Sequence, residues 1–170
     1  MKFIMLNGCS CSGKSTIVKN IMAQKERYYQ LSYDSLKWSF SQYRPDVHFD
    51  DVRALVRAVA ESVCGMNYNI VCDSALYRDA REELLQIPKK HGYEVIEINL
   101  EADYEVLEER FDSRVKDAIL NPEKRISNTS KDRFKELYDI YNAEKNPLAL
   151  TLRTDRETVE LITEKIVTLA

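Results

Sequence analysis

A glycine-bounded loop near the start of the chain carries the clearest chemical pattern in the sequence. Residues 8–15 match G-x-x-x-x-G-K-[ST] in full. Glycines let such a loop fold back, so that several backbone N–H groups and the N-terminus of the next helix converge on one anion. The pattern predicts a P-loop that holds the phosphates of a nucleotide, formed by Gly8, Cys9, Ser10, Cys11, Ser12, Gly13, Lys14, Ser15 and, one position further on, Thr16.

The last residues of the P-loop have separate expected roles. Lys14 is expected to contact the β- and γ-phosphates of ATP, and the hydroxyl of Ser15 to bind Mg²⁺. Thr16 is a further candidate, for the α-phosphate. The alternative is a chance match that only forms a turn. However, the motif follows an apolar segment, residues 2–7, and precedes a predicted helix, which is the context that phosphate binding requires.

Two aspartates follow apolar segments that are typical of strands. Asp34 comes after residues 28–33, and Asp73 comes after residues 69–72. Asp34 is our candidate general base, or the group that orients an acceptor hydroxyl. Asp73 is a candidate to hold Mg²⁺ through water or to bind the acceptor. The alternative for each is to cap the following helix, where aspartate is a favoured residue.

Basic side chains follow these aspartates. Lys37, Arg78 and Arg81 are candidates for the acceptor side of the site, together with Asp34 and Asp73. The alternative is that these side chains have no role in binding and only form part of an ordinary solvent-exposed helix face.

A pair of arginines precedes a polar segment that we expect to act as a lid, at about residues 113–130. Arg110 and Arg114 are four positions apart in a predicted helix and therefore share a face. In small P-loop kinases such arginines neutralise the transferring phosphoryl group. We therefore predict a catalytic set of Lys14, Asp34, Arg110 and Arg114; for the two arginines, surface ion pairs with nearby glutamates are the alternative.

Taken together, these segments resemble a group of P-loop kinases that includes polynucleotide 5′-kinase, zeta toxins and chloramphenicol phosphotransferase. The resemblance extends from residue 2 to about residue 115 and rests on residues 6–16, 28–37 and 70–81 and on the two lid arginines. In polynucleotide kinases the aspartate of the second segment is catalytic, and a basic residue three positions later holds the substrate. The lid arginines there contact ATP phosphates or the transferring group.

The sequence departs from the polynucleotide kinase pattern on the acceptor side. Tyr33 stands where those enzymes often have arginine, and Lys37 cannot make the bidentate contact that arginine makes with phosphate. These departures concern a polynucleotide acceptor and leave the phosphotransferase class unaffected.

The expected reaction is in-line transfer of the γ-phosphoryl group of ATP, with Mg²⁺, to a hydroxyl of a small molecule, a nucleoside or nucleotide, or a nucleic-acid end. The alternative is a regulatory switch ATPase that binds nucleotide without an acceptor; Asp34 and the lid arginines argue against it. The Asn-Lys-x-Asp motif of GTPases does not occur in the sequence, and 170 residues is short for a motor or AAA+ ATPase.

Strands alternate with helices along the chain, which predicts an α/β fold. We expect a three-layer P-loop NTPase sandwich in a single domain of residues 1–170, with a mostly parallel five-stranded sheet, helices on both faces and an arginine-bearing lid. The predicted strands are 2–7, 28–33, 69–72, 94–100 and 148–152. The predicted helices are 14–23, a short one after Asp34, 50–65, 78–91, 103–116, 131–145 and one from about 155, with a loop at 117–130.

Composition and charge limit the class of protein and the cellular location that the sequence is compatible with. Hydrophobic residues make up 44% and charged residues 31% of the chain, an ordinary globular mixture. The formal net charge of −3 does not favour binding of a nucleic-acid end over a small acceptor. No apolar run approaches the roughly 18 residues of a membrane span, and the first apolar run is too short for a signal peptide. We therefore expect a cytoplasmic protein with no membrane partner.

Four cysteines are present, two of them in the P-loop. The converging amides, Lys14 and the helix N-terminus should each stabilise a thiolate, so we expect Cys9 or Cys11 to have a lowered pKa and to react quickly with alkylating agents. Cys64 and Cys72 lie in predicted core elements. The alternative is that the P-loop cysteines are only small turn residues, and their spacing does not predict a metal site.

Overall fold

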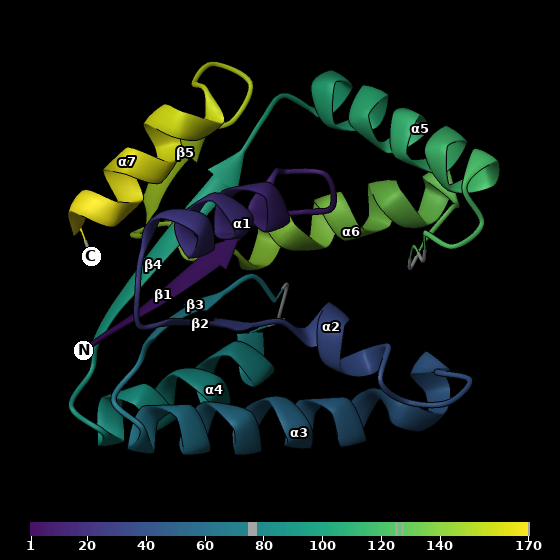
Figure 1. The fold of residues 1–170 in the computed structure, drawn as a ribbon. Helices are drawn as coiled ribbons and strands as arrows, with labels where there is room; N and C mark the ends of the chain where they lie inside the picture. Colours follow the sequence, from purple (N-terminus) through teal and green to yellow (C-terminus); the bar gives the residue numbers. More distant parts are fainter. Residues whose placement is uncertain (75–77, 125, 127, 170) are drawn as a thin grey trace.

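The computed structural model describes residues 1–74, 78–124, 126 and 128–169. For Arg78 it describes the backbone but not the side chain. It contains a five-stranded sheet with the strand order β2-β3-β1-β4-β5, in which all neighbouring strands are parallel (Figure 1). The strands are β1 (Lys2–Asn7), β2 (Tyr28–Leu31), β3 (Asn69–Cys72), β4 (Glu94–Glu101) and β5 (Leu150–Arg153). Because β3 and β4 flank β1, ligands are expected beyond the carboxyl end of β1.

Helices cover both faces of this sheet and its carboxyl end. They are α1 (Lys14–Gln24), α2 (Tyr33–Lys37), α3 (Pro45–Gly65), α4 (Arg78–Lys90), α5 (Tyr104–Leu120), α6 (Lys131–Glu144) and α7 (Val159–Leu169). Helices α3 and α4 pack on one face and α1 and α7 on the other, while α5 and α6 extend past the carboxyl ends of the strands (Figure 1). None of the helices in the described part of the chain has the length and apolarity needed to span a lipid bilayer.

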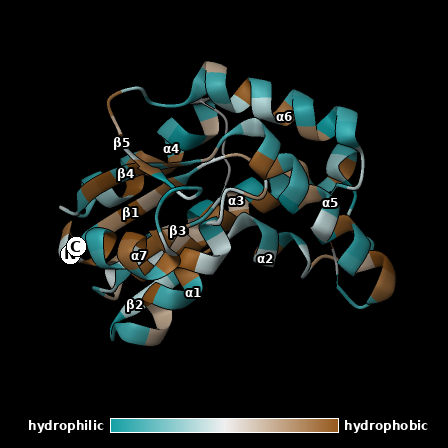
Figure 2. Cartoon of the chain, turned by 90° about the horizontal axis from the view of Figure 1, so that it is seen from above, coloured by the Kyte–Doolittle hydropathy of each residue, from teal (hydrophilic) through white to brown (hydrophobic). Residues whose placement is uncertain are grey.

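The two faces follow from the alternation of side chains along β1. Phe3 and Met5 point into one core, and Ile4 and Leu6 point into the other; all four are fully buried. A strand buried on both faces reads as a continuous apolar run, which is why residues 2–7 could be recognised as a central parallel strand. Seen from above, hydrophobic residues follow the strands of the sheet, and hydrophilic residues spread over the outer helices (Figure 2).

A third, smaller core joins α5 to α6 above the P-loop. The rings of Phe111 and Phe134 stack with their centroids 4.6 Å apart, and Tyr104 packs against Tyr138 at 5.0 Å. Cys9 of the P-loop belongs to the same buried cluster. The paired helices are therefore held against the phosphate-binding loop by apolar packing.

The strand before Asp34 ends earlier than predicted, and this changes the place of Asp34. Strand β2 stops at Leu31, and Ser32 caps α2 by accepting a hydrogen bond from the Ser35 backbone N–H, 3.3 Å away. Asp34 therefore lies in the first turn of α2. Since Ser32 is the cap, the alternative role of Asp34 as helix cap is wrong.

Several other boundaries also differ from the sequence-based expectation. Helix α5 continues to Leu120, so the predicted loop 117–130 begins later and residues 113–120 of the predicted lid are helical. Helix α3 begins at Pro45, where proline suits the first helical turn. Strand β5 is shifted to 150–153, and α7 begins at Val159 instead of near Asp155.

Candidate functional site

The P-loop connects β1 to α1 and packs tightly against β4. A Cβ atom on Gly8 would lie 2.3 Å from the Ser12 Oγ and 2.7 Å from the Leu100 carbonyl oxygen, so only glycine fits there. Gly13 caps α1 with a φ of 92°, in the left-handed region that glycine favours. The loop thus presents the N-terminus of α1 to the space beyond the strands.

Lys14 folds back over this loop. Its Nζ donates hydrogen bonds to the carbonyl oxygens of Gly8, at 2.7 Å, and Cys9, at 2.8 Å. Burial lowers the pKa of Lys14, while the charges of Asp73 and Asp34 favour the protonated form. The P-loop cation and both predicted carboxylates therefore lie close enough to interact.

Asp73 lies beside the hydroxyl of Ser15 at the end of β3. The Ser15 Oγ and the Gln30 Nε2 each donate to the Asp73 Oδ2 at 3.3 Å. Burial raises the pKa of Asp73, and the Ser32 hydroxyl, Lys14 and Ser15 oppose this effect. Within the described residues, the buried Oδ1 of Asp73 has no hydrogen-bond partner.

This donor set fits a magnesium ion. Mg²⁺ prefers oxygen ligands and is usually held by one or two carboxylates together with substrate phosphates. The orphaned Asp73 oxygen and the Ser15 hydroxyl provide such oxygens next to the P-loop. No cluster of three or more His, Cys, Asp or Glu side chains suited to a metal occurs among the residues described, so a metal held by protein side chains alone does not fit there.

Asp34 and Lys37 form an ion pair on α2, as their spacing of one helical turn allows. The Asp34 carboxylate is 65% exposed, whereas the Lys37 side chain is only 6% exposed. The Lys37 Nζ lies 4.9 Å from the ring centroid of Trp38 and 5.9 Å from that of Tyr43. Lys37 is thus enclosed by aromatic rings while Asp34 faces the open space.

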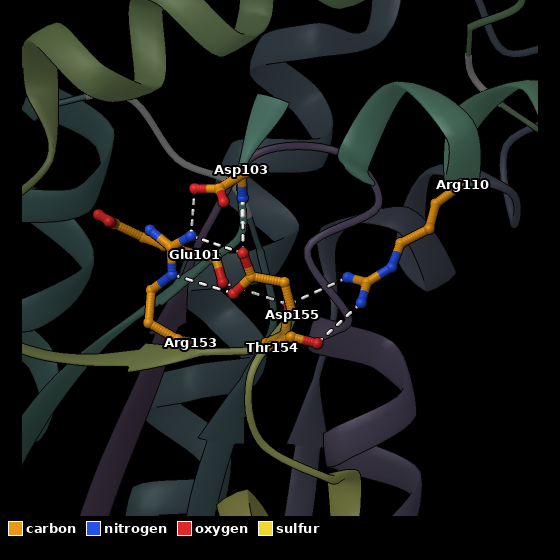
Figure 3. A network of polar contacts seen from close by, with 6 residues as sticks. All are labelled: Glu101, Asp103, Arg110, Arg153, Thr154 and Asp155. Atoms are coloured by element: carbon orange, nitrogen blue, oxygen red, sulfur yellow. Dashed lines mark hydrogen bonds and ion pairs between the residues drawn. The ribbon is translucent and has the colours of Figure 1, made fainter. Parts of the chain in front are cut away.

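Arg110 connects three parts of the molecule. Its Nη1 donates to the Cys11 carbonyl oxygen at 3.4 Å. The same nitrogen donates to the Thr154 Oγ1 at 3.0 Å, and its Nη2 donates to the Thr154 carbonyl oxygen at 2.7 Å (Figure 3). Arg114 lies one helical turn further along α5 and is exposed. In the part of the chain that is described, Arg114 makes neither an ion pair nor a hydrogen bond.

A polar network fixes the position of Thr154. Arg153 pairs with Asp103 and Asp155, and the Thr154 backbone N–H donates to the Glu101 carbonyl oxygen at 2.8 Å (Figure 3). The network joins the carboxyl ends of β4 and β5. Asp103 is the residue before α5, but its carboxylate binds Arg153 and makes no capping hydrogen bond.

A single cavity of about 1030 Å³ joins these groups. The P-loop forms one wall, α2 and the start of α3 form another, and α5, α6 and the segment after β5 close it. The predicted residues that line it are Gly8, Cys9, Ser10, Cys11, Gly13, Lys14, Ser15, Thr16, Asp34, Lys37, Asp73, Arg110 and Arg114. Ser12 is fully buried beneath the loop, and the side chain of Arg78 lies outside the described residues.

Comparison with protein families identifies the chain. A family model described as an AAA domain matches residues 3–137, which is most of the sequence. The chain belongs to this AAA-domain family. The family is one of P-loop, kinase-like proteins, which confirms the resemblance to P-loop kinases.

Several solved structures share this fold. A presumed kinase from Chloroflexus aurantiacus superposes with a TM-score of 0.71 at 18% identity, over 98% of this chain and 97% of that one. Chaetomium thermophilum Kti12, in complex with ADP-AlF3, has a TM-score of 0.65 at 17% identity, with 98% and 97% coverage. A chain of the Pnkp1/Rnl/Hen1 RNA repair complex has a TM-score of 0.68 at 15% identity, with 84% and 44% coverage.

At these identities the likeness establishes the fold. The predicted α/β sandwich with a parallel five-stranded sheet is confirmed. No curated protein shows significant sequence similarity to the chain.

Of the two P-loop cysteines of this AAA-domain protein, Cys9 does not have the lowered pKa that the sequence pattern suggested for one of them. Cys9 is buried in the core between α5 and α6, and burial raises its pKa to about 11, although Lys14 acts in the opposite direction. Desolvation therefore outweighs the positive potential of the loop. Cys64 and Cys72 are buried as expected, and burial raises the pKa of each to about 11. Cys11 is the P-loop cysteine that remains partly exposed, on the cavity wall.

Sequence reasoning missed the segment after β5. Thr154 and Glu157 line the cavity opposite α2, and Thr154 lies 3.8 Å from the position of a Cβ on Gly13. The signal was available, because the rule that ligands bind beyond the carboxyl ends of strands applies to β5 as well as to the first three strands.

Proposed function

We propose that this AAA-domain protein is a kinase that transfers the γ-phosphoryl group of ATP, bound with Mg²⁺, to a hydroxyl of an acceptor molecule. The observation that supports this most directly is the shared cavity. The P-loop with Lys14 forms one side of it, and the exposed carboxylate of Asp34 lies on the other, close enough for their charges to interact. A nucleotide sensor has no need of a carboxylate facing its P-loop, whereas a phosphotransferase does.

In this proposal the P-loop binds the triphosphate. The backbone amides at the start of α1 surround the β-phosphate, and Lys14 contacts the β- and γ-phosphates. Two of the three Lys14 N–H donors are already bonded to loop carbonyls, which keeps the ammonium group in place. Ser15 and Asp73 would hold Mg²⁺, which supplies positive charge against the developing negative charge on the phosphates.

Asp34 acts on the acceptor. It accepts a hydrogen bond from the acceptor hydroxyl, directs the oxygen at the γ-phosphorus, and takes the proton as the new O–P bond forms. The bond between the γ-phosphorus and the β–γ bridging oxygen breaks, and ADP leaves. The ion pair with the buried Lys37 holds the Asp34 side chain on α2 in position for this role.

The two lid arginines have different roles in this proposal. We assign a contact with the transferring phosphoryl group to Arg114, because its guanidinium is exposed on the cavity wall and uncommitted among the described residues. Arg110 positions the nucleotide site, since it ties α5 to both the P-loop and Thr154.

The test is transfer of label from γ-labelled ATP in the presence of Mg²⁺ to a panel of hydroxyl compounds: nucleosides, nucleotides, sugars and an oligonucleotide with a free 5′-hydroxyl. The proposal expects at least one acceptor to become labelled and to raise the rate of ADP formation. If ATP is bound and hydrolysed at a rate that no acceptor changes, the protein is instead a switch-type ATPase.

A further inference from the structure

We infer that the acceptor is an uncharged alcohol with an aromatic or similarly apolar ring, and that it carries no phosphate group. This inference rests on the proposed phosphotransfer and concerns the half of the cavity opposite the P-loop. Two independent observations carry it: the aromatic wall on that side, and the pairing of its cationic side chains with carboxylates.

The aromatic wall comes from α2, the segment that follows it and the start of α3. Tyr33, Trp38, Tyr43 and Phe49 all line the cavity, together with Pro45. The rings support one another, with Tyr33 and Phe49 at 6.0 Å and Trp38 and Tyr43 at 6.0 Å between centroids. The hydroxyls of Tyr33 and Tyr43 lie 3.2 Å apart and hydrogen-bond to each other. Such a wall offers apolar contact area on the same side of the cavity as Asp34.

Among the described residues, the cationic side chains that line the cavity outside the P-loop and α5 are paired. Lys37 is bound to Asp34, Arg81 lies 3.6 Å from Glu97, Arg133 lies 2.6 Å from Glu136, and Lys145 lies 2.6 Å from Glu101. In three of these pairs the cationic side chain is largely buried. The exposed fraction is 6% for Lys37, 13% for Arg81 and 28% for Lys145.

Paired cations make a poor phosphate site. A phosphate on the acceptor would have to displace a carboxylate from one of these pairs and leave that carboxylate without its partner. The carboxylate of Asp73 also lines the cavity and disfavours a second anion there. In the described part of the cavity, the uncommitted arginine is Arg114, which lies on the lid helix and is assigned to the triphosphate. The site is thus built for one polyanion, the nucleotide.

The chain offers a direct probe of this wall, because Trp38 is its single tryptophan. Trp38 fluorescence can be followed with Mg²⁺ and a saturating non-hydrolysable ATP analogue, so that the nucleotide end is filled. Three compounds that share a hydroxylated sugar are then titrated: thymidine, thymidine 3′-monophosphate and methyl 2-deoxyribofuranoside. We expect thymidine to bind at least about tenfold more tightly than either of the others, since only thymidine combines a planar base ring with the absence of a phosphate group.

A matched pair of variants locates the binding. Tyr43→Leu removes a ring of the wall and should weaken thymidine binding by about tenfold while the affinity for the ATP analogue stays the same. Tyr29→Leu removes an exposed tyrosine from strand β2, outside the cavity, and should change neither affinity.

The outcomes separate this inference from the proposed function. Tighter or equal binding of thymidine 3′-monophosphate, preferred labelling of a 5′-hydroxyl oligonucleotide, or no response of Trp38 to thymidine would each overturn the inference, even if phosphotransfer is observed. Saturable binding of thymidine with no ADP formed from ATP would instead contradict the kinase proposal and leave the chemistry of the pocket as inferred.

Discussion

At the scale of single residues, we expect the proposed nucleotide chemistry to depend most on Lys14. We expect Lys14→Ala to retain the fold and to lower turnover by about 10²–10³, because the main positive charge facing the phosphates is lost. Far-UV circular dichroism and the rate of ADP formation measure the two halves of this prediction. Lys19→Ala, at an exposed position of the same helix, is the control and should match the wild type. A folded Lys14→Ala protein with wild-type turnover would contradict the assignment.

Asp34 should affect the chemical step and not nucleotide binding. Asp34→Asn keeps an acceptor oxygen for Lys37 but removes the base, so kcat should fall by about 10²–10⁴. The affinity for a non-hydrolysable ATP analogue, measured by calorimetric titration, should stay nearly constant. Asp51→Asn, an exposed position on α3, is the matched control. If analogue binding is lost while the rate at saturation is normal, Asp34 belongs to the nucleotide site.

Among the cysteines, Cys11 should react first. It is partly exposed on the cavity wall, whereas Cys9, Cys64 and Cys72 are buried. We expect alkylation of Cys11 to be at least about tenfold faster than that of the other three, because accessibility and thiolate character control the rate. Bound Mg²⁺·ATP should slow it by covering the P-loop. Mass-spectrometric labelling rates test this, and equal rates at all four sites with no effect of nucleotide would contradict it.

At the scale of elements, the site depends on how β5 is joined to β4. Arg153 holds the pKa of Asp155 well below its usual range through hydrogen bonds, and the Asp103 backbone N–H donates to the same carboxylate at 3.0 Å. The network holds Thr154 next to Arg110 and the P-loop (Figure 3). A change in this network should therefore affect both stability and nucleotide binding.

The pH dependence of this network has a definite sign. The folded-state pKa of Asp155 is below its unfolded value of about 3.9, so its stabilisation is complete above that value and is lost as the pH falls toward the folded pKa. Asp155→Asn should lower the free energy of unfolding by about 1–3 kcal/mol at neutral pH. The difference from the wild type should shrink below about pH 4.

Urea denaturation at neutral and acid pH measures this difference. Asp46→Asn is the control, because Asp46 also binds an arginine, Arg44, but has an exposed side chain. It should change stability little at either pH. A destabilisation by Asp155→Asn that is as large at pH 3 as at pH 7 would show that the charge of Asp155 is not what stabilises this junction.

At the scale of the whole molecule, the cavity is formed by segments from all parts of the chain. Its walls come from the P-loop, α2 and α3, α5 and α6, and the segment after β5, so nucleotide can bind only when these are assembled. At 100 times its dissociation constant a ligand of the native state adds about 2.7 kcal/mol, which for a chain of this size raises Tm by about 5–10 °C. Differential scanning fluorimetry with Mg²⁺·ATP should show this rise. The same rise in Lys14→Ala would place the nucleotide elsewhere.

Local signals determined the nucleotide half of the site. The P-loop needs only eight consecutive residues, and the apolar segments around it and before Asp73 are buried on both faces of a parallel sheet, so short stretches of sequence were enough to recognise them. The α/β sandwich follows from the same alternation of strands and helices. Boundaries were less certain, because a single cap, such as Ser32 before α2, decides where a helix begins.

Tertiary structure alone decided the rest. Cys9 is buried because α5 and α6 pack over the P-loop, and this desolvation reverses the pKa shift that the local sequence implied. Thr154 meets Arg110 only because β5 lies beside β4, a pairing of residues 44 positions apart in the chain. The charges of the acceptor side depend in the same way on partners such as Glu97 and Glu101, which folding brings to Arg81 and Lys145. Burial and ion pairing are properties of spatial neighbours, and for these residues the neighbours are distant in sequence.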